Sequence, residues 1–96
     1  MARVELTLVA VENLERMILT HSLPRDTRLR LRKSLRVLKE FPLIGRQLSG
    51  EWQDMRFVLG PWRWLLVVYH YDQSEERVFV VTIQDARSHA AATSAR

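Results

Sequence analysis

The segments WRWLLVVY (residues 62–69) and RVFVVTIQDAR (residues 77–87) decide the fold, because both are rich in β-branched and aromatic residues. Such runs favour strands, and the intervening DQSEE (residues 72–76) is typical of a hairpin turn. Pairing the two strands places Arg63, near the start of the first, beside Arg87 at the end of the second. Two planar, permanently charged guanidiniums held on rigid strands are typical of a phosphate or carboxylate site. The alternative is that each arginine caps a strand end in solvent.

The preceding part of the chain predicts a strand and then two helices. Apolar and polar residues alternate over residues 3–8, as in a half-buried strand. Two apolar stripes at helical spacing follow; Pro24 suits the first turn of the second helix, and Pro42 ends it. The residues expected to form these stripes are Ala10, Leu14, Met17, Ile18 and His21 in the first helix, and Leu31, Leu35, Leu38 and Phe41 in the second.

The order of predicted elements indicates an α+β fold in a single domain (residues 1–96). Residues 42–52 predict a loop, and residues 53–59 predict a strand with Met55 and Phe57 toward the helices and Arg56 on the far face. The order β-α-α-β-β-β predicts a helical hairpin packed on one face of a mostly antiparallel four-stranded sheet. The far face is expected to form a shallow, partly polar concavity, and residues 90–96 a flexible tail. The sheet residues expected to contact the helices are Trp62, Trp64, Leu66 and Val68.

Composition narrows the function classes. The chain has no cysteine, which excludes disulfides, a thiolate nucleophile and thiolate metal ligands. Its three histidines have no paired spacing, so we expect no metal site, and no cofactor is implied. The first residues alternate charge with apolar side chains, unlike a signal peptide, and the longest apolar run (residues 64–69) is too short to span a bilayer. We therefore expect a cytoplasmic protein with no membrane partner.

The positive charge is concentrated in the second predicted helix. The net charge is +4 and the pI is near 10.3, which favours an anionic partner such as nucleic acid or an acidic protein segment. Residues 25–39 hold seven of the fifteen basic residues. A solvated charged face is the alternative interpretation. The candidate nucleic-acid contacts are Arg28, Arg32, Arg36 and, in the following loop, Arg46.

Three segments, in this order and spacing, resemble the RelE/ParE superfamily of bacterial toxins. LKEFPLIGR (residues 38–46) resembles the family's helix end followed by Pro-x-x-Gly-Arg. Residues 62–69 resemble its aromatic-Arg strand with a later tyrosine, and IQDAR (residues 83–87) resembles its last strand, which ends in arginine. The resemblance covers residues 3–89. It implies a type II toxin–antitoxin system in which a segment of the cognate antitoxin wraps the toxin. Members either cleave mRNA in the ribosomal A site or inhibit DNA gyrase, and fold alone does not choose between these activities.

The nuclease interpretation needs a base, an acid and positive charge at the scissile phosphate. Arg56, Arg63 and Arg87 are the candidates for the charge, and His89 for the acid or base, since Arg87-Ser88-His89 resembles the C-terminal Arg-x-His of some nuclease members. Glu51 is a weaker candidate base. The chain departs from the family in having alanines (residues 90–92) where several members carry a tyrosine, and no lysine in residues 53–59.

The gyrase interpretation needs no catalytic residue. Ala86-Arg87 resembles the ending of the ParE branch, although Gln84, Asp85 and Ser88 replace three of its residues.

Of the two activities that the resemblance implies, the sequence favours the nuclease: a toxin that acts with the ribosome as a metal-independent mRNA endoribonuclease. The alternatives are a ParE-like gyrase inhibitor and a degenerate nucleic-acid-binding member.

Overall fold

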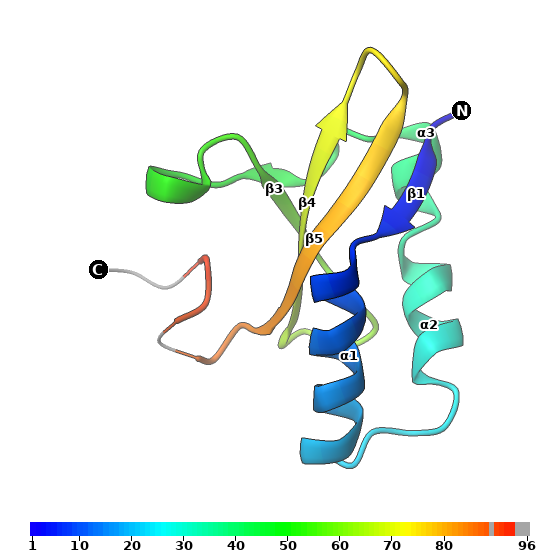
Figure 1. Ribbon diagram of the computed structural model, residues 1–96, viewed down its shortest axis with the longest axis vertical. Helices are drawn as coiled ribbons and strands as arrows, with labels where there is room; N and C mark the ends of the chain where they lie inside the picture. The colour runs from blue at the N-terminus through cyan, green and yellow to red at the C-terminus, as the bar shows by residue number, and fades with distance from the viewer. Residues whose placement is uncertain (89, 94–96) are drawn as a thin grey trace.

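A helical layer covers one face of a single sheet in the computed structural model, which describes residues 1–88 and 90–93 (Figure 1). The strands lie in the order β1-β5-β4-β3-β2; β1 is parallel to β5 and every other pair is antiparallel. The predicted α+β class and mostly antiparallel sheet are confirmed. The elements are β1 (Arg3–Leu6), α1 (Leu8–Thr20), α2 (Thr27–Ser34), α3 (Val37–Glu40), β2 (Arg46–Gln47), the 3₁₀ helix η1 (Gly50–Trp52), β3 (Arg56–Leu59), β4 (Leu65–Asp72) and β5 (Arg77–Asp85).

The sheet has five strands, so the prediction of four was wrong. The additional strand is β2, in which Arg46 and Gln47 pair with Phe57 and Arg56 of β3. A strand of two residues is too short for alternating polarity to reveal, and it lies in the segment that was predicted to be a loop.

The second predicted helix is also divided. Arg36 N–H bonds Lys33 O and Leu38 N–H bonds Leu35 O, three residues back rather than four, so α2 and α3 are separated by a tight turn. The turn changes the direction that later residues face. Phe41, predicted to be buried, is 57% exposed.

Two polar side chains attach α1 to the edge of β5. Thr7 caps α1 by accepting from Ala10 N–H (3.2 Å), and its hydroxyl lies 3.0 Å from both Val80 O and Val81 O. Asn13 Oδ1 accepts from Ile83 N–H at 3.1 Å. Because β1 ends at Leu6, these side chains satisfy backbone groups of β5 that a longer β1 would have paired.

The core lies between the helices and the sheet, largely as predicted. The helical residues Leu14, Leu31, Leu35 and Leu38 are buried, with Met17 and Ile18 packed against them. Trp62 and Trp64 also pack on this core. The prediction was wrong for Leu66 and Val68, which are buried on the other face. The two tryptophans precede the strand, which begins at Leu65, so alternation counted from them reverses the faces. The strand residues that meet the helices are Leu65, Val67, Tyr69, Val78, Val80 and Ile83.

The same reversal applies to β3. Arg56 pairs with Tyr69, whose ring faces the helices, and cross-strand partners share a face. Arg56 therefore lies on the helical side, whereas Met55 and Phe57 lie on the open face, contrary to the prediction for all three.

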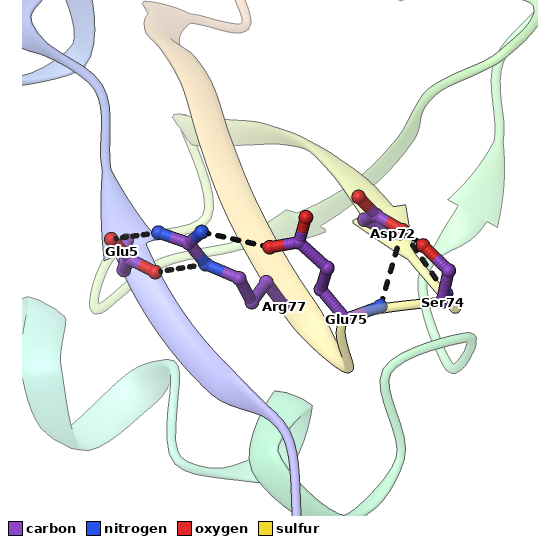
Figure 2. A network of polar contacts seen from close by, with 5 residues as sticks. All are labelled: Glu5, Asp72, Ser74, Glu75 and Arg77. Carbon is purple, nitrogen blue, oxygen red and sulfur yellow. Dashed lines mark hydrogen bonds and ion pairs between the residues drawn. The ribbon is translucent and has the colours of Figure 1, made fainter.

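Ion pairs and a capped turn close one end of the β4–β5 hairpin (Figure 2). Arg77 donates to Glu5 of β1 (2.7 and 2.9 Å) and to Glu75 (3.0 Å), so it joins the parallel strand to the hairpin. Asp72 accepts from Ser74 N–H (3.0 Å) and Ser74 Oγ (2.7 Å), which orders the turn. The bond from Arg77 lowers the pKa of Glu5, and the bond from Ser74 lowers the pKa of Asp72.

Candidate nucleic-acid interface

The open face of the sheet, away from the helices, is hollowed. The predicted concavity exists here, with a volume of about 740 Å³. Residues of β2, η1 and β3 line it together with residues 90–93 of the C-terminal segment. Figure 1 shows the C-terminal segment on the side of the sheet away from α1 and α2. The residues lining this open-face concavity are Arg46, Gln47, Leu48, Ser49, Gly50, Glu51, Trp52, Phe57, Ala90, Ala91, Ala92 and Thr93.

Local backbone constraints shape this hollow. Gly50 begins η1 with a φ of +65°, a conformation that disfavours a side chain. Leu48 N–H donates to Met55 O (2.9 Å), and Gln47 Nε2 donates to Gln53 O (3.1 Å). These bonds close the loop between β2 and β3, so that charged, polar and aromatic side chains share one surface.

Arg46 is the one residue of the predicted site that lines the concavity among those the structure describes. Glu51, the weaker candidate base, and Trp52 lie there too. Sequence reasoning missed Gln47 and Ser49. Neither belongs to a motif, and only the return of β3 against β2 brings them to the hollow.

The predicted catalytic Arg87 lies at the end of β5, where it is held by Asp85. Its guanidinium donates to both carboxylate oxygens (2.9 and 2.8 Å) and lies 4.8 Å from the centre of the Trp64 ring. Asp85 also bonds His21 Nε2 at 3.1 Å. The bonds from Arg87 hold the pKa of Asp85 well below its usual range, and Asp85 raises the pKa of Arg87. Asp85, which the sequence analysis did not select, therefore orients this arginine; an acid two residues before it was the available signal.

Aromatic stacking joins this end of the sheet to the helices. His21, the C-terminal cap of α1, stacks on Trp64 with ring centroids 5.1 Å apart, and Trp64 stacks on Trp62 at 5.9 Å. Arg30 of α2 lies 6.0 Å from the Trp62 ring. A smaller pocket of about 300 Å³ adjoins the cluster and is lined by Arg16, His21, Asp85 and Ser88, among others. We call it the sheet-end pocket.

Arg63 and Arg56, the other predicted catalytic arginines, have different surroundings. Arg63 is exposed in the turn before β4. The backbones there are adjacent as predicted, because Ala86 N–H donates to Trp64 O at 2.7 Å. Arg56 donates to Leu43 O (3.3 Å) and Gly45 O (2.9 Å), so it supports the loop before β2. His89, the predicted acid or base, lies outside the described residues.

The basic residues of α2 lie on the helical side. Arg28 pairs with Glu15 of α1, and Arg28 and Arg32 line a groove of about 430 Å³ between the helices and β1. Arg36 is exposed in the turn between α2 and α3. The structure thus separates Arg28 and Arg32 from Arg46, which lines the open face.

Residues 90–93, at the start of the predicted tail, lie against the sheet. Ala91 is 5% exposed and packs with Leu48, Leu66 and Val68, and Ala92 N–H donates to Gln84 Oε1 at 2.7 Å. The segment has no large apolar residue, and its alanines are small enough to fit against the open face.

Residues 1–88 and 90–93 contain no group of three or more His, Cys, Asp or Glu side chains placed to hold a metal ion. None of their helices combines the length and the apolar character needed to cross a bilayer.

Comparisons with known proteins agree with the architecture. No family model and no curated protein sequence matches this chain. Among solved structures, it is similar to a chain of the toxin–antitoxin complex RelBE2 from Mycobacterium tuberculosis, with a TM-score of 0.64, 20% identity and coverage of 88% of this chain and 96% of that one.

Two proteins from Helicobacter pylori are also similar, each over 88% of this chain and 94% of theirs. The conserved hypothetical protein HP0892 gives a TM-score of 0.59 at 17% identity, and HP0894 gives 0.55 at 14%. At these identities the likeness concerns the fold. The sequence resemblance agrees with this likeness, and what the likeness shows is that the chain shares the fold of these three proteins.

Proposed function

We propose that the protein is the toxin of a type II toxin–antitoxin pair and that it acts on RNA at the open-face concavity. The observation that carries the proposal is the combination of this fold with a polar hollow on the sheet face that the helices leave free. The basic net charge supports an anionic substrate.

The lining of the concavity fits single-stranded RNA. Unpaired bases stack on aromatic side chains, and phosphates are held by arginine. Trp52 and Phe57 provide aromatic surface, Arg46 a cation, and Gln47 and Ser49 hydrogen-bonding groups. A shallow site open to solvent suits an extended strand better than a duplex.

Metal-free cleavage would proceed by attack of the ribose 2′-hydroxyl on the adjacent phosphate. A base takes the hydroxyl proton, cations stabilise the developing charge, and an acid protonates the departing 5′-oxygen. We assign the charge to Arg46, Arg63 and Arg87, with Glu51 or His89 for proton transfer. Arg56 is less suited, because its guanidinium is bonded to two backbone carbonyls.

The antitoxin is the proposed protein partner. The groove between the helices and β1 is lined by Val4, Leu6, Val11, Leu14, Leu31 and Leu35, and by the charged residues Arg28, Arg32, Lys39 and Glu15. Apolar walls with predominantly basic neighbours fit an amphipathic, acidic helix. We propose that such an antitoxin segment binds there and neutralises the toxin.

Inducible expression without an antitoxin tests the proposal. We expect growth arrest in which amino-acid incorporation stops before DNA synthesis, together with new 5′ ends in translated mRNA. Arg46→Ala should reduce this effect. Arg25→Ala, another exposed arginine outside the concavity, is the matched control. Harmless expression of folded protein would contradict the toxin assignment.

A gyrase inhibitor is the second candidate, favoured by one observation. Two of the predicted catalytic arginines, Arg56 and Arg87, are already engaged within the molecule, which suits a binding surface more than an acid–base centre. In that case DNA synthesis would stop first, and the same labelling experiment distinguishes the two activities.

A further inference from the structure

The C-terminal segment separates two hollows, one on the open face and one between α1 and the end of β5. Ala90 and Ala91 line both the open-face concavity and the sheet-end pocket, which are about 740 and 300 Å³ in volume. Ala91 is buried against Leu48, Leu66 and Val68, so the segment lies directly on the sheet. The space beneath it belongs to the same face as the proposed RNA site.

We propose that residues 90–93 form an autoinhibitory strap, which blocks the middle of a longer RNA groove and is displaced when single-stranded RNA binds. The inference rests on the RNA-binding function proposed above and concerns the regulation of that site. With the strap in place, Arg46 and Trp52 lie on one side of it and Asp85 on the other.

Displacement of the strap joins two sets of residues that the structure keeps apart. The concavity supplies Arg46, Glu51 and Trp52, whereas the sheet-end pocket contains Asp85, which holds Arg87. Proteins that bind single strands follow the backbone along a positively charged groove several nucleotides long. With Ala90 and Ala91 displaced, the joined hollow would run from Arg46 to Arg16 and to Asp85, which holds Arg87, so that a cation stands toward each end of it.

The strap is held by contacts weak enough to be exchanged for RNA. It buries one alanine methyl group closely, and it is attached to β5 by the bond from Ala92 N–H to Gln84 Oε1. The bond from Ala91 N–H to Ser88 O (3.1 Å) lies within the C-terminal segment itself. Loss of one such hydrogen bond shifts an equilibrium by about 2- to 10-fold.

Gln84→Met tests the strap, because it keeps the side-chain length and removes the oxygen that accepts from Ala92 N–H. Gln73→Met, in the distant β4–β5 turn, is the matched control. Since the chain has no cysteine, Leu48→Cys introduces a unique thiol beneath the strap. Its alkylation rate, measured in each background with the thermal midpoint as a check on folding, reports how often the strap lifts without requiring RNA.

We expect Gln84→Met to raise the alkylation rate by about 2- to 10-fold and to lower the Kd for a fluorescent, unstructured RNA oligonucleotide by a similar factor. Gln73→Met should change neither. Ala92→Pro, which removes the donor instead of the acceptor, should reproduce both effects, and it decides the matter if Gln84→Met does not fold.

The outcomes separate the strap from the proposed function. An unchanged alkylation rate would show that the strap does not cover Leu48 through this bond and would overturn the inference. Faster alkylation with unchanged or weaker RNA binding would overturn the autoinhibitory role while RNA binding stands. Faster alkylation with no RNA binding by any protein, wild type included, would overturn the proposed RNA function itself.

Discussion

Arg77 and Arg87 occupy the two ends of the β5 region, and each is bonded to carboxylates, yet their surroundings differ. Arg77 bonds Glu5, 72 positions earlier, and is 31% exposed (Figure 2). Arg87 bonds Asp85, two positions earlier, and is 63% exposed. The first pair joins distant strands. The second orients an exposed guanidinium within one short segment, beside Trp64.

The comparison shows that the position of the partner, rather than the residue type, separates a structural arginine from a candidate functional one. Removing Arg77 leaves Glu5 of β1 without its partner, which weakens the attachment of β1 to the sheet. Removing Arg87 loses a charge that is exposed to solvent. We call these the tied end and the exposed end of the hairpin.

The largest expected effect is on the core beneath the tied end. Leu35 is 3% exposed and lines the groove beside Val4 and Leu6 of β1. Leu35→Ala should lower the free energy of unfolding by about 2–5 kcal/mol through lost burial and a residual cavity. Leu29→Ala, at an exposed position of α2, the helix that Leu35 caps, is the control for denaturant titration. Equal denaturation midpoints for the two variants would mean that Leu35 does not contribute to the core beneath β1.

The next test compares activity and thermal stability in variants of the two ends. Arg87→Ala should lower the proposed nuclease activity by about 10²-fold or more, because a charge is lost from the transition state, and should leave the thermal midpoint nearly unchanged. Arg77→Ala should lower the midpoint more and leave the activity of the folded protein intact. Both the activity and the thermal midpoint should be measured in both variants. A larger loss of activity in Arg77→Ala, with a larger loss of stability in Arg87→Ala, would refute the distinction between the two ends.

As pH falls, Glu5 at the tied end should be protonated before Asp85 at the exposed end. The pKa of Glu5 is lowered by Arg77, and that of Asp85 is lowered further by Arg87 and His21. A carboxylate with a depressed pKa stabilises the fold above its ordinary value, about 4.3 for Glu and 3.9 for Asp, and this contribution is lost as pH falls through the folded-state pKa. Carboxyl NMR titration should therefore show Glu5 protonated at a higher pH than Asp85. Asp85→Asn should remove the titration step at the lower pH.

The smallest expected effect concerns Arg28, a third arginine with a carboxylate partner. Its pair with Glu15 joins α1 to α2, but both side chains are at least half exposed. Arg28→Ala should change the free energy of unfolding by less than about 1 kcal/mol. If nucleic acid also contacts this helix, the variant should bind it slightly less tightly and with a weaker salt dependence. If Arg28→Ala lowered the free energy of unfolding as much as Leu35→Ala, an ion pair between residues distant in sequence would be structural even when both side chains are exposed.

The sequence alone determined the identity and order of most elements of this protein. Runs of β-branched residues indicated β4 and β5, and helical spacing identified the buried leucines of α1 and α2, because these signals are local and repeat along the chain. The order of three short motifs likewise predicted a fold that the chain shares with a chain of the RelBE2 toxin–antitoxin complex.

Only the tertiary structure decided which face each residue occupies and which residues meet. Alternation fixes the relative positions of neighbours, but a turn before β4 resets it, so Leu66 and Val68 lie on the face opposite to that predicted. The unpaired Val81 resets it again in β5, so that Val80 and Ile83 share a face. Arg56 lies on the helical side because it pairs with Tyr69. The concavity and the contact of Ala91 with Leu48 depend on residues more than forty positions apart. No periodic pattern encodes such contacts, because they arise when a short strand, a 3₁₀ turn and the C-terminal segment pack on one sheet.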